Sequence, residues 1–160
     1  MPASALRSGE RGAWLERAPR SLRPRAALAL VAAAQAEIGV WGTLAPHSLY
    51  NGYPGAGHHW VSVLGPYDEH LVRDFAAGQL GLAVLLVCAA VWFERRLVRV
   101  AAAAFLAASL PHFAYHLTTT DHLSTADDIA SLGGFALELV LVAAAAISVG
   151  RNRPPPERST

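Results

Sequence analysis

The chain has 160 residues, of which 53% are hydrophobic, and a formal net charge of +1. A nearly neutral chain carries no global basic field, which argues against nucleic acid as a partner. The single cysteine, Cys88, excludes an intramolecular disulfide and a metal site built from several cysteines. The charged residues are segregated between long apolar stretches, a pattern typical of membrane proteins rather than soluble domains.

Four apolar stretches are each long enough to cross the hydrocarbon core of a bilayer, which needs about 20 helical residues. They lie at 26–44, 75–93, 98–117 and 129–149. Only helices and closed barrels satisfy their backbone hydrogen bonds inside a lipid bilayer. We therefore predict an all-α fold, an antiparallel four-helix transmembrane bundle, in a multi-pass protein of the bacterial plasma membrane.

The arginines predict the orientation of this bundle. All thirteen basic residues are arginine, and twelve of them precede the first span, separate the second from the third, or follow the fourth. Because basic residues gather on the cytoplasmic side, both termini are expected in the cytoplasm. A basic N-terminal segment, 1–25, and a tail, 150–160, then flank a membrane domain, 26–149, whose long outer loop is 46–73.

The first span also admits a second interpretation. Arg25 is followed by an apolar run and then by Ala34-Gln35-Ala36, which resembles the cleavage site of a signal peptide. The apolar residues continue beyond this point, which favours a span that is retained.

Polar side chains in or beside the spans are the candidate site residues. An ionisable group inside a span costs roughly 2.5–3.5 kcal/mol on insertion scales, so each one is a functional hypothesis. His112 and His116 form an i,i+4 pair on one face of the third helix. Glu138 lies about nine residues, roughly 13 Å, below the outer end of the fourth. We predict an outward-facing polar pocket, with Glu37 and Glu138 at its floor, formed by Glu37, Glu69, His70, Arg73, Asp74, Gln79, His112, His116 and Glu138.

Three interpretations of this pocket stay open. His112 and His116 with a carboxylate suit a divalent metal, which would make the protein a metal-dependent membrane oxidoreductase or hydrolase. Without a metal, the pocket would bind a small molecule or a lipid headgroup, or relay protons. In the third interpretation, the histidines and glutamates hydrogen-bond across helices and specify packing.

Polar residues at the outer ends of the helices suggest local roles. Arg73, the one basic residue on the outer side, is expected either to pair with Glu69, Asp127 or Asp128 or to bind an anionic ligand. Ser124 and Asp127 have the pattern of an N-cap for the fourth helix.

Small residues and the outer loop predict how helices and partners meet. Gly78, Gly81, Gly133 and Gly134 are expected to let helices approach closely. The loop 46–73 is rich in glycine, proline and aromatic residues, so a membrane scaffold or complex subunit that docks a partner through this loop is another class of function. Four helices leave little room for a transport pathway, so transport would require a homo-oligomer.

Two motifs carry a family resemblance. The segment GPYDEHLVRD leads into the second span, and PHFAYH lies in the third. They resemble a group of small bacterial four-helix membrane proteins without an assigned activity, which are similar in gross architecture to DoxX-like proteins. The resemblance covers roughly 45–150 and implies the four-helix architecture without implying a reaction. The matching positions are Gly65, Pro66, Tyr67, Glu69, His70, Arg73, Asp74, Pro111, His112 and His116.

Overall fold

The computed structural model describes residues 22–119 and 122–151, and every regular element in these two ranges is a helix. Four of the helices are long and apolar enough to cross a membrane, which confirms the predicted all-α four-helix bundle. The N-terminal residues before 22 and the tail from 152 were assigned from the sequence to cytoplasmic segments and lie outside the described residues. In chain order the helices are α1 (Leu22–Leu44), α2 (Pro46–Gly52), α3 (Glu69–Trp92), α4 (Arg95–Thr118) and α5 (Thr125–Arg151).

A capping side chain and a left-handed residue set the two ends of α3. α3 begins at Glu69, earlier than the predicted 75, because the Asp68 carboxylate caps it by accepting a hydrogen bond from the Leu71 amide at 3.1 Å. It ends at Trp92 because Phe93 adopts a left-handed conformation with φ of 52°. α4 then begins at Arg95, so α3 and α4 are joined by a very short turn. α4 stays helical through Pro111, although proline lacks the amide donor for the preceding turn.

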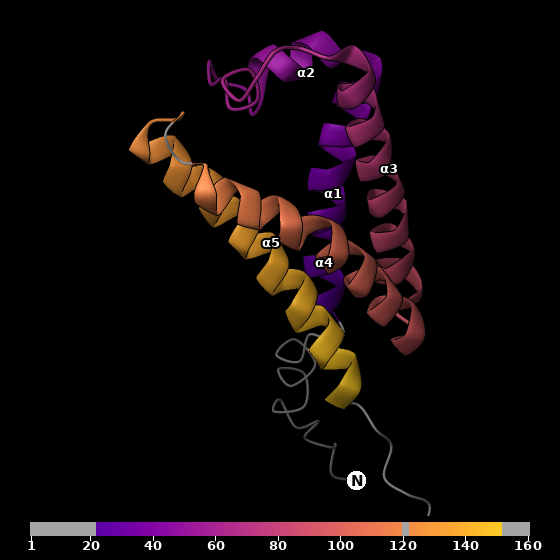
Figure 1. Ribbon diagram of the computed structural model, residues 1–160. Coiled ribbons are helices and arrows are strands. Elements are labelled where there is room, and N and C mark those ends of the chain that lie inside the picture. The colour runs from indigo at the N-terminus through magenta and orange to yellow at the C-terminus, as the bar shows by residue number, and fades with distance from the viewer. Residues whose placement is uncertain (1–21, 120–121, 152–160) are drawn as a thin grey trace, which may run out of the picture.

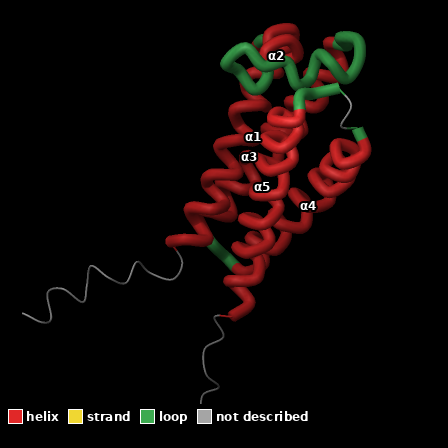
Figure 2. Tube along the Cα trace, turned by 90° about the vertical axis from the view of Figure 1, so that its left-hand side faces the viewer, coloured by secondary structure: helices red, strands yellow, loops and turns green. Residues whose placement is uncertain are grey.

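The helices form two pairs that converge at one end of the molecule. α1 and α3 lie side by side, and α4 and α5 slant away from them toward the opposite end (Figures 1 and 2). At the converging end α1 begins, α3 turns into α4, and α5 ends. We call it the arginine end, because Arg25 near the start of α1 and Arg95, Arg96 and Arg99 at the start of α4 lie there. The other end, which carries α2 and the segment 53–68, is called the loop end.

Glycines on α1, rather than those predicted, allow the closest helix approach. A Cβ atom at Gly39 would lie 2.7 Å from Leu80 Cγ, and one at Gly42 would lie 2.7 Å from Ala76 Cβ. The expectation for the other four glycines was wrong. A Cβ atom at any of them would meet nothing within 4 Å, because they lie beside the open space between the helix pairs or on the outer surface; they are Gly78, Gly81, Gly133 and Gly134.

The hydrophobic core occupies the arginine end, where all four long helices meet. Phe105 of α4 is completely buried there. Arg25 lies at this end and donates from Nη1 to the Ala90 and Val91 carbonyl oxygens at 3.1 and 2.7 Å. It thereby satisfies two hydrogen-bond acceptors at the C-terminus of α3. Because packing is concentrated here, the loop end is left hollow. The core side chains include Leu28, Val31, Leu86, Val98, Phe105, Val142 and Val149.

Candidate ligand-binding cavity

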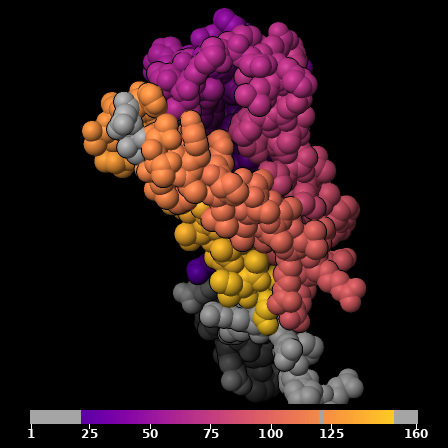
Figure 3. Space-filling view, viewed as in Figure 1, coloured from indigo at the N-terminus to yellow at the C-terminus, as the bar shows by residue number. Residues whose placement is uncertain are grey.

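A cavity of about 690 Å³ lies between the two helix pairs toward the loop end. Figure 3 shows the hollow between the segment that follows α2 and the slanting α4–α5 pair. Its lining is mostly aliphatic and aromatic, and the segment 53–68 contributes Tyr53, Trp60, Val61 and Leu64 as a roof. Polar side chains from α1, α3, α4 and α5 also reach it, and these are Gln35, Asp74, Gln79, Ser109, His112, His116, Ser131 and Glu138.

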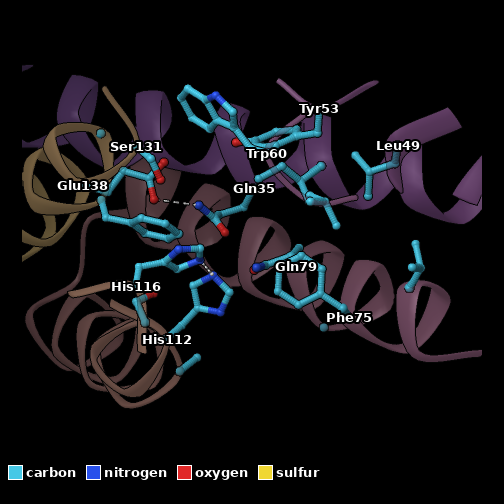
Figure 4. Close-up of a pocket in the computed structure, with 18 of the residues that line it drawn as sticks. Gln35, Leu49, Tyr53, Trp60, Phe75, Gln79, His112, His116, Ser131 and Glu138 are labelled. Atoms are coloured by element: carbon cyan, nitrogen blue, oxygen red, sulfur yellow. Dashed lines mark hydrogen bonds between the residues drawn. The ribbon is translucent and has the colours of Figure 1, made fainter. Parts of the chain in front are cut away.

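Two hydrogen-bonded polar pairs face this cavity (Figure 4). Gln35 Nε2 of α1 donates to Glu138 Oε2 of α5 at 3.0 Å, and Gln35 is only 4% exposed. His112 and His116 of α4 hydrogen-bond through their Nε2 atoms at 3.1 Å, one ring donating and the other accepting. The first pair joins the two halves of the bundle, and the second presents imidazole rings to the cavity from one helix.

Gln79 of α3 has an acceptor atom without a partner. Its Oε1 is buried and makes no hydrogen bond with the described part of the chain. A buried polar atom of this kind costs about 1–3 kcal/mol when it stays unpaired. Since Gln79 lines the cavity, a ligand there would be able to supply the missing donor.

Aromatic side chains hold the two histidine rings in place. The Phe75 ring of α3 stacks on His112 with centroids 5.8 Å apart, and the Phe135 ring of α5 lies 5.0 Å from His112 and 5.2 Å from His116. Within the described ranges, no cluster of three or more His, Cys, Asp or Glu side chains is arranged to hold a metal ion. The histidine pair therefore offers two nitrogen donors, one short of the three protein ligands of catalytic zinc sites.

Hydrogen bonds fasten the roof of the cavity to the start of α5. Trp60 Nε1 donates to Asp127 Oδ1 at 2.9 Å, and His58 Nδ1 lies 2.7 Å from the same oxygen. Ser124 caps α5, because its Oγ accepts a hydrogen bond from the Asp127 amide at 3.2 Å, as the sequence predicts. Burial, and then the charges of Glu138 and Glu37, raise the pKa of the Tyr53 hydroxyl in this roof. The roof thus joins the α1–α3 pair to the α4–α5 pair across the opening.

The structure brings together part of the predicted site. Asp74, Gln79, His112, His116 and Glu138 line the cavity, while Glu37, Glu69, His70 and Arg73 do not.

Arg73 instead links two helix ends. Its Nε donates to Glu69 Oε1 at 2.8 Å, and its Nη1 donates to the Thr43 carbonyl oxygen at 2.6 Å. Of the three partners predicted for Arg73, Glu69 is therefore the one that it contacts, and the guanidinium also caps the C-terminus of α1. His70 lies 3.2 Å from Asp74, and both side chains are largely exposed.

Glu37 is the largest departure from the predicted pocket. It is exposed on α1, and Gln35 takes the position opposite Glu138 that was expected for Glu37. Helix geometry explains this, because two residues of α-helix turn the side chain through about 200°. The buried face of α1 runs through Leu28, Val31, Ala32, Gln35, Gly39 and Gly42.

Sequence reasoning missed three further lining residues, Gln35, Tyr53 and Trp60. Gln35 was discoverable from its spacing with the two α1 glycines, since residues three or four apart share a helix face. Ser131 was predictable, because its spacing places it on one stripe of the fourth span with Gly134 and Glu138. Tyr53 and Trp60 had no comparable signal, because a loop can place its side chains only through tertiary contacts.

Comparison with known proteins gives no relative: no protein-family model, no curated protein and no solved structure matches the chain. The function therefore has to be sought in the cavity itself, because a four-helix architecture alone specifies no activity.

Proposed function

We propose that this chain is a bacterial plasma-membrane protein that binds a small amphipathic ligand in the cavity between its two helix pairs. Its four membrane-crossing helices support the membrane part of the proposal. The arginines that precede, connect and follow the helices at the arginine end support a cytoplasmic position for that end. The cavity would then lie toward the outer face.

The size and lining of the cavity define the class of ligand. A volume of about 690 Å³ falls within the range of about 300–1,000 Å³ that ligand sites occupy. Aliphatic and aromatic side chains suit an apolar body, and the Gln35–Glu138 and His112–His116 pairs suit a polar group that both donates and accepts hydrogen bonds. The expected ligand is therefore a molecule with an apolar body and one polar end.

The observation that carries this proposal is the buried Gln79 Oε1 atom, which lies in the cavity lining without a hydrogen-bond partner in the described part of the chain. A purely structural polar core would be expected to satisfy that atom internally. A ligand donor that reaches Gln79 would remove its desolvation cost and so contribute to affinity.

The alternatives drawn from the sequence have weaker support. A metal-dependent oxidoreductase or hydrolase needs a third ligand beside His112 and His116, and the described residues supply none. A scaffold that docks a partner through the 46–73 loop would have to leave Trp60 in place, because its indole is already bonded to Asp127.

Two adjacent glycines of α5 provide a matched test. Gly134 lines the cavity and Gly133 does not, and a Cβ atom at either position would meet nothing within 4 Å. Gly134→Phe should therefore fill the cavity without a backbone clash, and Gly133→Phe should leave it open. Detergent-purified protein would be extracted with organic solvent, and the extracted small molecules would be measured by mass spectrometry.

The proposal expects a compound at near-stoichiometric amount from the wild type and from Gly133→Phe, with a loss of at least tenfold from Gly134→Phe. Gln79→Leu, which removes the unpaired acceptor, should also lower the amount. Equal recovery from the two phenylalanine variants, or no retained compound in the wild type, would argue against a ligand in this cavity.

A further inference from the structure

The outward face of α1 carries a regular stripe of exposed residues, which we call the Glu37 stripe. Its members alternate at spacings of four and three residues, so they follow the seven-residue repeat of a helix-pairing seam. All of them are exposed, including Leu30 at 61%, Val40 at 48% and Leu44 at 77%. The stripe consists of Ala26, Leu30, Ala33, Glu37, Val40 and Leu44.

Glu37 does not fit a face that contacts only lipid. It comes about 22 Å after the start of α1 and about 10 Å before its end, at a rise of 1.5 Å per residue, so it lies well inside the membrane span. Ionisable residues within membrane spans almost always face the protein interior or a polar partner. Within the described chain, Glu37 takes part in no ion pair and does not line the cavity.

We infer that the Glu37 stripe is the interface between two copies of this chain, which pair α1 with α1 across a two-fold axis along the membrane normal. Twelve of the thirteen arginines lie on one side of the predicted spans, so we expect all copies to insert in the same direction. The two helices are then parallel, and each residue of the stripe meets its own counterpart. Two Glu37 carboxyl groups would then face each other and share one proton in a hydrogen bond.

The distribution of polar groups favours a second copy over a contact between unlike faces. The exposed mid-span residues of α3 and α5 are apolar, and they include Val84, Val87 and Val140. Pairing one of these faces with the stripe would leave Glu37 against hydrocarbon. Among the described residues of the membrane helices, the symmetric pairing places the Glu37 carboxyl group of the second copy opposite Glu37. Ala26 and Ala33 are small enough to let the two α1 helices approach closely.

Cysteine cross-linking in membranes tests this interface without reference to the cavity. In a Cys88→Ala background, Val40→Cys places a thiol on the stripe, and Val84→Cys makes the same substitution on the exposed face of α3. Both positions are well exposed, at 48% and 64%. After oxidation with copper phenanthroline, Val40→Cys should give a disulfide-linked dimer of this chain, and Val84→Cys should give at least fivefold less.

The role of the carboxyl group is tested in the Val40→Cys protein. Glu37→Leu should lower the cross-linked fraction at least threefold, and Glu37→Gln should largely keep it, because an amide also hydrogen-bonds to its own copy. Circular dichroism would verify that each variant stays folded. Equal cross-linking at the two positions, no effect of Glu37→Leu, or a product whose mass identifies a different protein would overturn the inference.

Discussion

Gly39→Ala should separate α1 from α3 and destabilise the bundle. The new Cβ atom would lie 2.7 Å from Leu80 Cγ, 2.8 Å from Leu80 N and 3.0 Å from Ala76 O. Carbon atoms pack best at about 3.5–4.0 Å, so the helices would have to move apart by roughly 1 Å. Two of the three neighbours are backbone atoms, which cannot rotate away as a side chain can.

The size of the effect follows from two opposing contributions. Overpacking in a well-packed contact costs about 1–3 kcal/mol, and replacing glycine by alanine inside a helix returns up to about 1 kcal/mol. We therefore expect the free energy of unfolding to fall by about 1–2 kcal/mol. Gly81→Ala is the control, because a Cβ atom there would meet nothing within 4 Å. It should gain up to about 1 kcal/mol from helix propensity alone.

The assay is reversible unfolding in mixed micelles of increasing sodium dodecyl sulfate content, followed by helical circular dichroism. The two glycine variants should shift the midpoint in opposite directions. If Gly39→Ala matched the wild type, or if both variants shifted together, the close approach of α1 and α3 would not be what stabilises this pair.

Three other predictions concern the cavity and its roof. Asp127→Ala removes the acceptor of the Trp60 indole, so hydrogen exchange in the roof segment 53–68 should rise about tenfold. Asp128→Ala is the control and should leave this exchange unchanged. Equal exchange in both variants would mean that the Trp60–Asp127 bond does not hold the roof. The raised pKa of Tyr53 means that its contribution to stability is present below the unfolded value of about 10 and is lost as the pH rises through the folded value. Tyr53→Phe should therefore reduce the loss of stability above about pH 10 in a pH series of the same unfolding assay. If the variant lost as much stability as the wild type above this pH, the result would count against burial of the Tyr53 hydroxyl. Elemental mass spectrometry should find the same metal content in wild type and His112→Ala, and near-stoichiometric metal that disappears in the variant would favour the metal-dependent alternative.

The number and type of the membrane helices could be predicted from the sequence because their cause is local. A run of apolar residues long enough to cross a bilayer has to satisfy its own backbone hydrogen bonds, and a helix does so without reference to the rest of the chain. The Ser124–Asp127 cap and the His112–His116 pair were also predictable, since both depend on spacing within one helix.

The membership of the cavity depended on tertiary structure. Gln35 and Glu37 are two residues apart in the same span and equally polar, yet only Gln35 points into the bundle, where it bonds to Glu138. Apolar character alone does not decide which face of an almost uniformly apolar helix turns inward. Here the close approach of α1 to α3 at Gly39 and Gly42 decides it, since these two positions of that face carry no side chain.

The sequence by itself thus determined four helices of membrane-spanning length, the Ser124–Asp127 cap of α5 and the i,i+4 geometry of the histidines. Only the tertiary structure decided three other features. Arg73 bonds to Glu69 and to the end of α1, and Trp60 of the roof bonds to Asp127. Glu37 faces outward. The physical reason is that apolar length and helix spacing act within one segment, whereas the rotation and splay of helices result from packing between segments far apart in the chain.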